Sequence, residues 1–419
     1  MPQSAITHSI VPGLVPGIHV FRIHATVKLK GSKHIMKSIT VATLALFAAT
    51  PALAQQGVSP TEIVVGTAQD LSGPVVALSK PAVNGMRMRI DEENAAGGVN
   101  GRKLRLVVED HGYDPKKAVL AAQKMVQQDK IFVALGSIGT PTAMAAMQIY
   151  LDAKVAHLFP LTGARQMFEP LHDLKYSFAA PYYDQIRAAM KRVIKDKNLK
   201  KICTIYQDDD YGLEVMQGGE HALKDLGMSY AEKTTYKRGT TDFSSQVAKM
   251  KEAGCDGVVM GTIIRETIGT IATARKLDWN PQFVGTTASY FDIIHKLGGA
   301  VVNGFYSACT INYPYEDDKS EKVRAWFASY KGKYKEDPTV LSAYGYQLTG
   351  LFIEAAKKAG KDLNPDTLAK SLAGLSVPAD FFGGDEQKFS STKHLGSDRS
   401  MLCQIQDGKW KSVSEYLTN

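Results

Sequence analysis

The chain has 419 residues, of which 44% are hydrophobic and 22% charged, and its formal net charge is +8 at pH 7. A chain of this length and apolar content can form two domains of ordinary size, each with its own core. The sequence has no zinc-ligand spacing, no basic stripe and no interleaving of aromatic with basic residues, which argues against a nucleic-acid-binding protein.

Residues 36–54 have the pattern of a secretory signal. A short basic start at Met36-Lys37 precedes an apolar run from Ile39 to Ala49, and Ala52-Leu53-Ala54 supplies a small-residue cleavage site. The apolar run is shorter than the roughly 20 residues that a membrane-spanning helix needs. Because Gln55 rather than a cysteine follows the site, we expect no lipid anchor and no membrane insertion. The sequence predicts export to the periplasm and cleavage after Ala54.

Residues 1–35 precede this complete signal and contain no acidic residue. We interpret them as a mis-set start, with a genuine extended leader as the alternative. The segment 1–54 holds five basic residues and no acidic one, so the chain from Gln55 carries a net charge of +3. Much of the apparent basicity therefore belongs to the leader.

Apolar periodicity and turn residues predict alternating strands and helices. In the first part we expect strands at 62–66, 103–109, 131–135 and 155–159, with helices at 84–94, from 114 onward and at 141–151. The order repeats with helices at 184–197, 211–226, 242–253 and 265–277 and strands at 201–206, 228–236, 257–261 and 282–285. Helices at 319–334 and 339–359 and strands at 386–389 and 401–406 follow. This order predicts an α/β fold of two lobes with parallel sheets and a ligand site in the cleft between them.

Two turns follow predicted strands in the first lobe and suit a carboxylate ligand. Gly136–Thr142 joins a strand to a helix start, where free backbone N–H groups and the Thr140 hydroxyl favour an anion. The alternative is that Thr140 only caps its own helix. Pro160–Ala164 is a second turn of the same kind, with an ordinary turn as the alternative.

In the second lobe, Arg265 follows a predicted strand and has the fork geometry that clamps anions, but pairing on a helix surface is the preferred interpretation. The run Asp208-Asp209-Asp210 lacks the spacing of a calcium loop, so we expect one of these residues to cap the next helix. His157 lies in an apolar strand and is expected to be a core histidine with its hydrogen bonds satisfied.

Catalytic, metal and cofactor motifs are missing from the sequence. There is no GxSxG, HExxH, GxGxxG or Walker motif, and the histidines are scattered. We therefore expect no enzyme, no metal and no cofactor. The four cysteines, which allow three full pairings, form no CxxC. Cys203 is interpreted as a small buried hydrophobic residue, while an oxidising compartment would permit a Cys309–Cys403 bridge.

These motifs, in this order, resemble the type I periplasmic binding proteins of ABC transporters, in the leucine/isoleucine/valine-binding branch. The resemblance covers nearly all of residues 60–419. It rests on Leu71-Ser72-Gly73-Pro74, Asn84-Gly85, Gly97–Gly101, Asp114-Pro115, Gly136–Thr142, Pro160–Ala164, Asp210-Tyr211-Gly212, Asp242-Phe243-Ser244 and Asp256–Arg275.

The resemblance implies two Rossmann-like lobes joined by three crossovers, which close on a ligand by a hinge motion. Residues 60–179 with 312–378 would form lobe 1, and residues 180–311 with 379–419 would form lobe 2. It further implies a monomer that delivers its ligand to an inner-membrane ABC permease. A ligand sensor on the same fold and, less favoured, a secreted α/β hydrolase stay open as alternatives.

The resemblance also implies site residues. The ligand carboxylate would be held by the turn at Gly139-Thr140 and the turn at Leu161-Thr162-Gly163. The positions that match the ligand-covering aromatic residues of the family are Leu78, Tyr211, and Ile263 or Ile264. Tyr182 matches a crossover position where a polar group is expected, and Thr287 lies where the family has an acid for the ligand's ammonium group.

One departure from the family pattern concerns the amino group of an amino-acid ligand. The branched-chain amino-acid binders place an acid after the strand at 282–285, and this chain has Thr286-Thr287-Ala288-Ser289 there. A buried ammonium group without a counter-charge is costly. We therefore predict a small carboxylate with an apolar or aromatic body, and an amino acid only if Asp292, Glu266 or another acid reaches the site.

Overall fold

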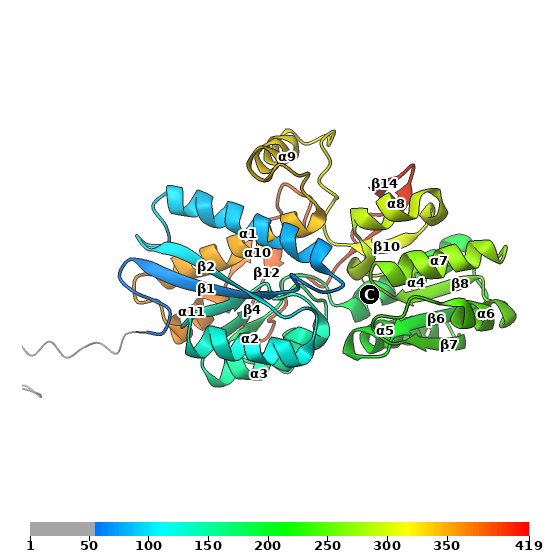
Figure 1. Cartoon of the computed structure of the whole chain (residues 1–419), viewed down its shortest axis with the longest axis horizontal. Coiled ribbons are helices and arrows are strands. Elements are labelled where there is room, and N and C mark those ends of the chain that lie inside the picture. The colour runs from blue at the N-terminus through cyan, green and yellow to red at the C-terminus, as the bar shows by residue number, and fades with distance from the viewer. Residues whose placement is uncertain (1–54, 419) are drawn as a thin grey trace, which may run out of the picture. The chain divides into compact units, whose positions relative to one another are not determined.

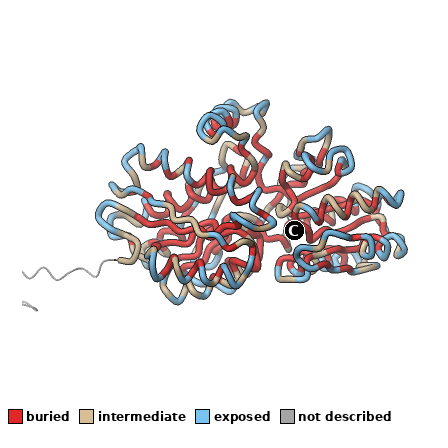
Figure 2. The backbone as a smooth tube through the Cα atoms, in the orientation of Figure 1, coloured by how far each residue is buried: buried red, intermediate tan, exposed pale blue. Residues whose placement is uncertain are grey.

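The computed structural model describes residues 55–418, so the predicted signal and leader lie outside the described residues. Strands and helices alternate as predicted, and the strands form two large sheets and one small one. Within 55–418, none of the helices combines the length and the apolar character needed to cross a membrane. Figure 2 shows that the strands at the centre of each sheet are buried, with the exposed backbone mainly on the outer turns.

The first sheet is entirely parallel, with the strand order β2-β1-β3-β4-β5. Helices α1 and α10 lie on one side of it, and α2 and α3 on the other (Figure 1). Its strands are β1 Glu62–Gln69, β2 Lys103–Asp110, β3 Val133–Leu135, β4 Ala156–Leu158 and β5 Lys175–Tyr176. The helices that cover it are α1 Val76–Ala95, α2 Pro115–Gln127, α3 Thr140–Asp152 and α10 Val340–Ala359.

The second sheet has the order β14-β13-β10-β9-β8-β6-β7 and differs from the prediction in being mixed. Its two C-terminal strands pair antiparallel at one edge. The strands are β6 Ile202–Gln207, β7 Tyr230–Tyr236, β8 Gly257–Gly261, β9 Gln282–Gly285, β10 Tyr306–Cys309, β13 Met401–Gln406 and β14 Lys409–Ser412. Its helices are α4 Tyr182–Lys197, α5 Asp210–Asp225, α6 Ser244–Glu252, α7 Arg265–Lys276 and α8 Asp292–Gly298.

The remaining elements lie toward the C-terminus. A two-stranded sheet pairs β11 with β12, so the predicted strand at 386–389 does not join either large sheet. The sequence pattern missed the strands β5, β10, β11 and β14 and the helices α8 and α11. The bounds are α9 Glu321–Tyr334, α11 Pro365–Leu372, β11 Ser376–Val377 and β12 Gln387–Lys388.

Helix α1 begins at Val76, well before the predicted start at residue 84. The misleading residue is Pro81, which lies inside the helix and removes one helical N–H donor. Burial of Ala82, Val83 and Met86 on the same helix compensates for this loss. The longer helix matters for the site because it carries Leu78 on its first turn.

Helices α1 and α10 meet at a pair of glycines. A Cβ atom on Gly85 would lie 2.0 Å from the Ser342 carbonyl oxygen, and a Cβ on Gly345 would lie 2.1 Å from the Ala82 carbonyl oxygen. Each helix thus uses a glycine to admit the backbone of the other. This contact joins chain segments that are far apart in the sequence.

All four cysteines form disulfides, Cys203–Cys255 and Cys309–Cys403, each with a Cα–Cα distance of 5.9 Å. The prediction that Cys203 is only a small buried hydrophobic residue is therefore wrong. Its place in an apolar strand concealed the pairing, because Cys255 lies just before the neighbouring strand β8. Both bridges lie in the part of the chain that forms the second sheet.

Candidate functional site

The carboxyl ends of strands from both large sheets lead into one cavity of about 80 Å³. On the same measure a single water molecule needs about 10–15 Å³, so the cavity has room for a small ligand rather than one solvent molecule. Ten of the eleven predicted site residues line it. They are Leu78, Gly139, Thr140, Leu161, Thr162, Gly163, Tyr182, Tyr211, Ile263 and Thr287.

The wall from lobe 1 is polar and is built from the two predicted turns. The Thr140 and Thr162 hydroxyl oxygens lie 2.6 Å apart, and both residues are buried. Among the described residues, the N–H of Thr140 has no hydrogen-bond acceptor, and the N–H of Gly163 faces the Tyr182 hydroxyl. Two hydroxyls and two N–H groups thus converge at the N-terminus of α3, where the helix dipole favours an anion.

Gly139 precedes this helix start and has φ +95°, a region that side-chain-bearing residues rarely adopt. A Cβ there would lie 2.6 Å from the Tyr113 ring. The helix cap position is occupied by Gly139, which has no side chain to cap with. The alternative in which Thr140 only caps its own helix is therefore wrong, since Thr140 is the first helical residue and its hydroxyl bonds to Thr162.

The wall from lobe 2 is mainly apolar and aromatic. The rings of Tyr182 and Tyr211 meet edge to face with their centroids 5.1 Å apart, and Ile263 lies beside them in the lining. The Tyr211 hydroxyl donates to the Thr262 carbonyl at 2.9 Å, which fixes the ring. Burial raises the pKa of the Tyr211 hydroxyl well above its ordinary value, so this group stays protonated.

Thr287 is tied to Gln185, a residue that the sequence analysis missed. The Thr287 N–H and hydroxyl both donate to the Gln185 side-chain oxygen, at 2.9 and 3.1 Å, and the Gln185 amide donates to the Ala180 carbonyl at 2.6 Å. Both residues line the cavity. The polar groups of this wall are thus already paired with each other.

Other lining residues were not among the predicted site residues. Ile138 and Pro160 lie inside the two predicted turns, and most of the others lie on segments with no strand-end or turn signal. Tyr344 lies within α10, and its hydroxyl and that of Thr310 are 2.9 Å apart. The missed residues of the lining are Val75, Tyr113, Ile138, Pro160, Phe178, Ala179, Gln185, Ala288, Phe291, Thr310, Leu341 and Tyr344.

Among residues 55–418, no acidic or basic side chain lines this cavity. Asp292, one of the acids considered for a ligand ammonium group, forms an ion pair with Lys296 at 2.6 Å. Glu266, the other one, lines a second cavity together with Ile264 and Arg265. Ile264, the eleventh predicted residue, is therefore not part of the first cavity, and its neighbour Ile263 is.

Three further expectations can be compared with the structure. Asp209 caps α5 by accepting from the N–H groups of Tyr211 and Gly212, as the capping interpretation predicted. Arg265 forms no ion pair within the described part of the chain, so its expected surface pairing is wrong. His157 is fully buried as expected, but neither ring nitrogen has a hydrogen-bond partner there, so it is not a satisfied histidine.

An ion pair connects the two lobes beside the site. Arg165 lies after strand β4, and Glu214 lies on helix α5. The backbone N–H and the side chain of Arg165 both donate to the Glu214 carboxylate, at 2.7–3.0 Å. Glu214 is 2% exposed, and the Arg165 guanidinium lies 4.0 Å from the centre of the Tyr183 ring. This contact joins the segment that follows β4 to helix α5.

The family model described as "Periplasmic binding protein" matches residues 62–409. A Leu/Ile/Val-binding protein homolog from Brucella abortus is 25% identical and aligns with 88% of this chain and 96% of its own length. A branched-chain amino acid ABC transporter protein from Thermus thermophilus, solved with valine, has a TM-score of 0.78 at 17% identity and covers 86% of this chain and 98% of its own. A solute-binding protein from R. palustris in complex with benzoate has a TM-score of 0.74 at 20% identity, covering 84% and 95%.

The chain belongs to the periplasmic binding protein family. The resemblance stated from the sequence is confirmed, as is the α/β fold of two lobes. The family is one of binding proteins rather than of enzymes, and its name places its members in the periplasm.

Proposed function

We propose that this protein captures a small carboxylate with an apolar or aromatic body and delivers it to an ABC permease of the inner membrane. The observation that carries the proposal is the asymmetry of the cavity. Hydrogen-bond donors converge at Thr140, Thr162 and Gly163, while the remaining lining is largely apolar. A carboxylate accepts hydrogen bonds and would be stabilised by these donors.

The same cavity disfavours an amino acid. No carboxylate lines it within residues 55–418 to receive an ammonium group, and a buried unpaired charge is costly. The relatives themselves differ in ligand, since one was solved with valine and another with benzoate. The cavity of this chain fits the second kind of ligand better.

In this proposal the two lobes close on the ligand by a hinge motion, and the ligand shifts the equilibrium by preferring the closed arrangement. The Arg165–Glu214 pair, which spans the lobes beside the cavity, supports the idea of a defined closed arrangement. The protein would work as a monomer in the periplasm after cleavage at Ala54, with no cofactor.

A thermal-shift and calorimetry panel on the purified protein tests the proposal. It compares leucine, isoleucine and valine with their keto acids, benzoate, hydroxybenzoates and phenylpropanoids. A ligand at 100 times its dissociation constant adds about 2.7 kcal/mol of stability, a shift of a few degrees. Acids without an amine should raise the midpoint, and leucine should not. A strong shift with leucine alone would contradict the proposed ligand class.

A further inference from the structure

A second cavity, larger than the first, adjoins the candidate site. Its volume is about 480 Å³, against about 80 Å³ for the first cavity. Val75, Tyr113 and Ile263 line both, so the two cavities share walls. A ligand whose body outgrows the inner cavity would reach the outer one by passing between these three side chains.

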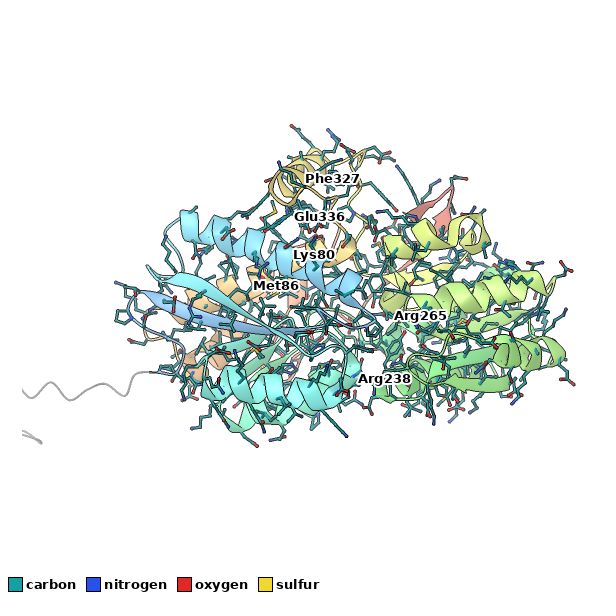
Figure 3. All side chains as sticks on the ribbon, viewed as in Figure 1. Lys80, Met86, Arg238, Arg265, Phe327 and Glu336 are labelled. Atoms are coloured by element: carbon teal, nitrogen blue, oxygen red, sulfur yellow. A yellow bond between two sulfur atoms is a disulfide. The ribbon has the colours of Figure 1, made fainter. Side chains whose placement is uncertain are left out.

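The outer cavity differs from the inner one in charge. Its lining includes Arg238, which follows β7, and Arg265, on the first turn of α7; both are labelled in Figure 3. Within residues 55–418, the one acidic residue of this lining is Glu266. Its side chain is buried, with 8% exposed, whereas Arg265 is exposed to solvent. The two guanidinium groups and one carboxylate leave one net positive charge in the lining.

Both arginines have hydrogen-bond donors to spare. Arg238 contacts Asp209 at 3.7 Å and donates to the Tyr113 carbonyl at 3.3 Å. Asp209 itself is engaged in capping α5, and Arg265 has no ion pair or recorded hydrogen bond within residues 55–418. A guanidinium has five N–H donors in a fork that matches a carboxylate, so most of this capacity is unused.

Apolar residues line both cavities between the polar threonines of the inner one and the arginines of the outer one. Val75 and Ile263 lie in both linings, and Pro74, Ala77, Ile264 and Ile268 extend the apolar surface in the outer cavity. The inner cavity thus contains the hydroxyls of Thr140 and Thr162, the outer cavity contains the two arginines, and apolar residues line both.

We propose that the site takes an elongated dicarboxylic acid with an apolar spacer, whose far carboxylate binds Arg238 and Arg265 in the outer cavity. The proposal rests on the proposed function, because it assumes that the near carboxylate is held at Thr140 and Thr162. Within the carboxylates with an apolar body, it selects the α,ω-dicarboxylates as the ligand class.

Calorimetry with matched acids tests this inference on the intact protein. Octanoate and octanedioate have the same chain length and differ in the far carboxylate. Both are titrated into the unchanged protein, Arg238→Gln, Arg265→Gln, the double variant, and Lys276→Gln. Lys276 is an exposed residue in the last turn of α7 and lines neither cavity, so its variant controls for the loss of one positive charge from the same helix.

We expect octanedioate to bind at least tenfold more tightly than octanoate, because a carboxylate–guanidinium fork is worth this much or more. The double variant should lose that advantage and keep its affinity for octanoate, and Lys276→Gln should keep both. Equal affinities in the unchanged protein, or an advantage that survives the double variant, would overturn the inference but leave the proposed function standing. Failure of both acids, with failure of the wider carboxylate panel, would overturn the proposed function and the inference with it.

Discussion

The two lobes share one architecture but differ in what holds them and in what they present to the ligand. Lobe 2 contains both disulfides, and its wall of the cavity is mainly aromatic and aliphatic. Lobe 1 has no cysteine in the described chain, contains the unpaired buried His157, and presents the polar turns around Thr140 and Thr162. We therefore expect reduction of the disulfides to destabilise lobe 2 and acid to destabilise lobe 1. Ligand affinity should depend chiefly on the hydroxyls of Thr140 and Thr162 in lobe 1.

The largest effect is expected from the disulfides. Replacing Cys203 and Cys255 by Ala opens a bridge between residues 52 apart, and chain entropy predicts a loss of about 4 kcal/mol in the free energy of unfolding. Hydrogen exchange should accelerate in β6 and β8 and stay unchanged in β1 and β3. Equal loss of protection in both lobes would show that the lobes unfold as one unit and would break the comparison.

Acid should destabilise lobe 1 through His157. Burial, with a smaller effect of the Lys175 charge, lowers the pKa of His157 to about 4. Because the folded pKa lies below the unfolded one of about 6.5, this contribution to stability is complete above pH 6.5 and is lost as the pH falls toward 4. The total contribution of His157 to the free energy of unfolding is about 3 kcal/mol.

His157→Leu should flatten the fall in unfolding free energy between pH 6.5 and 4, measured by denaturant titration at each pH. His221→Gln is the matched control, since it removes a histidine that is exposed instead of buried. A variant as acid-sensitive as the unchanged protein would assign the effect to other buried histidines, such as His111.

The two threonines should dominate affinity. Thr140→Ala with Thr162→Ala removes the hydrogen-bonded hydroxyl pair, which has one proton free to donate to a charged ligand, and this predicts about a hundredfold weaker binding of the best carboxylate in the panel. Serine at both positions should restore most of it by calorimetry. Thr349→Ala is the control, because its hydroxyl is also buried but bonds within α10. Unchanged affinity in the double alanine variant would place the carboxylate elsewhere.

The smallest effect is expected from adding the missing acid. Thr287→Asp puts a carboxylate into the lobe 2 wall, where it can pair with a ligand ammonium group. Leucine affinity should rise about tenfold, and affinity for the matching keto acid should fall. If both ligands weaken equally, Thr287 does not face the ligand's amino position, and the variant has only disturbed the contact with Gln185.

The fold and the lobe 1 wall could be predicted from the sequence because strand ends and helix starts carry local signals. Thr140 and Thr162 were found in this way. The choice between Ile263 and Ile264 had no such signal, since these adjacent residues differ only in that Ile263 lines both cavities and Ile264 lines the outer one alone. Gln185 escaped because its role depends on a contact with Thr287, a hundred residues away in the chain.

The sequence also could not show which cysteines pair or whether Arg265 forms an ion pair, because both depend on distances between residues in the folded structure. Cys203 and Cys255 come together because β6 and β8 are neighbours in the sheet, which the order of strands along the chain does not reveal. The positions of the lobe boundaries and the ligand roles of the lining residues stay predictions.

The close contact of α1 with α10 has a consequence for the order of synthesis. The first sheet is complete by β5, but the Gly85 backbone meets its partner only when Ser342 and Gly345 have been made. Lobe 1 therefore has its strands early and the helix that covers them late. Until then the buried face of α1 lacks the helix that covers it, so the core of lobe 1 cannot be finished before the chain has been made as far as Gly345.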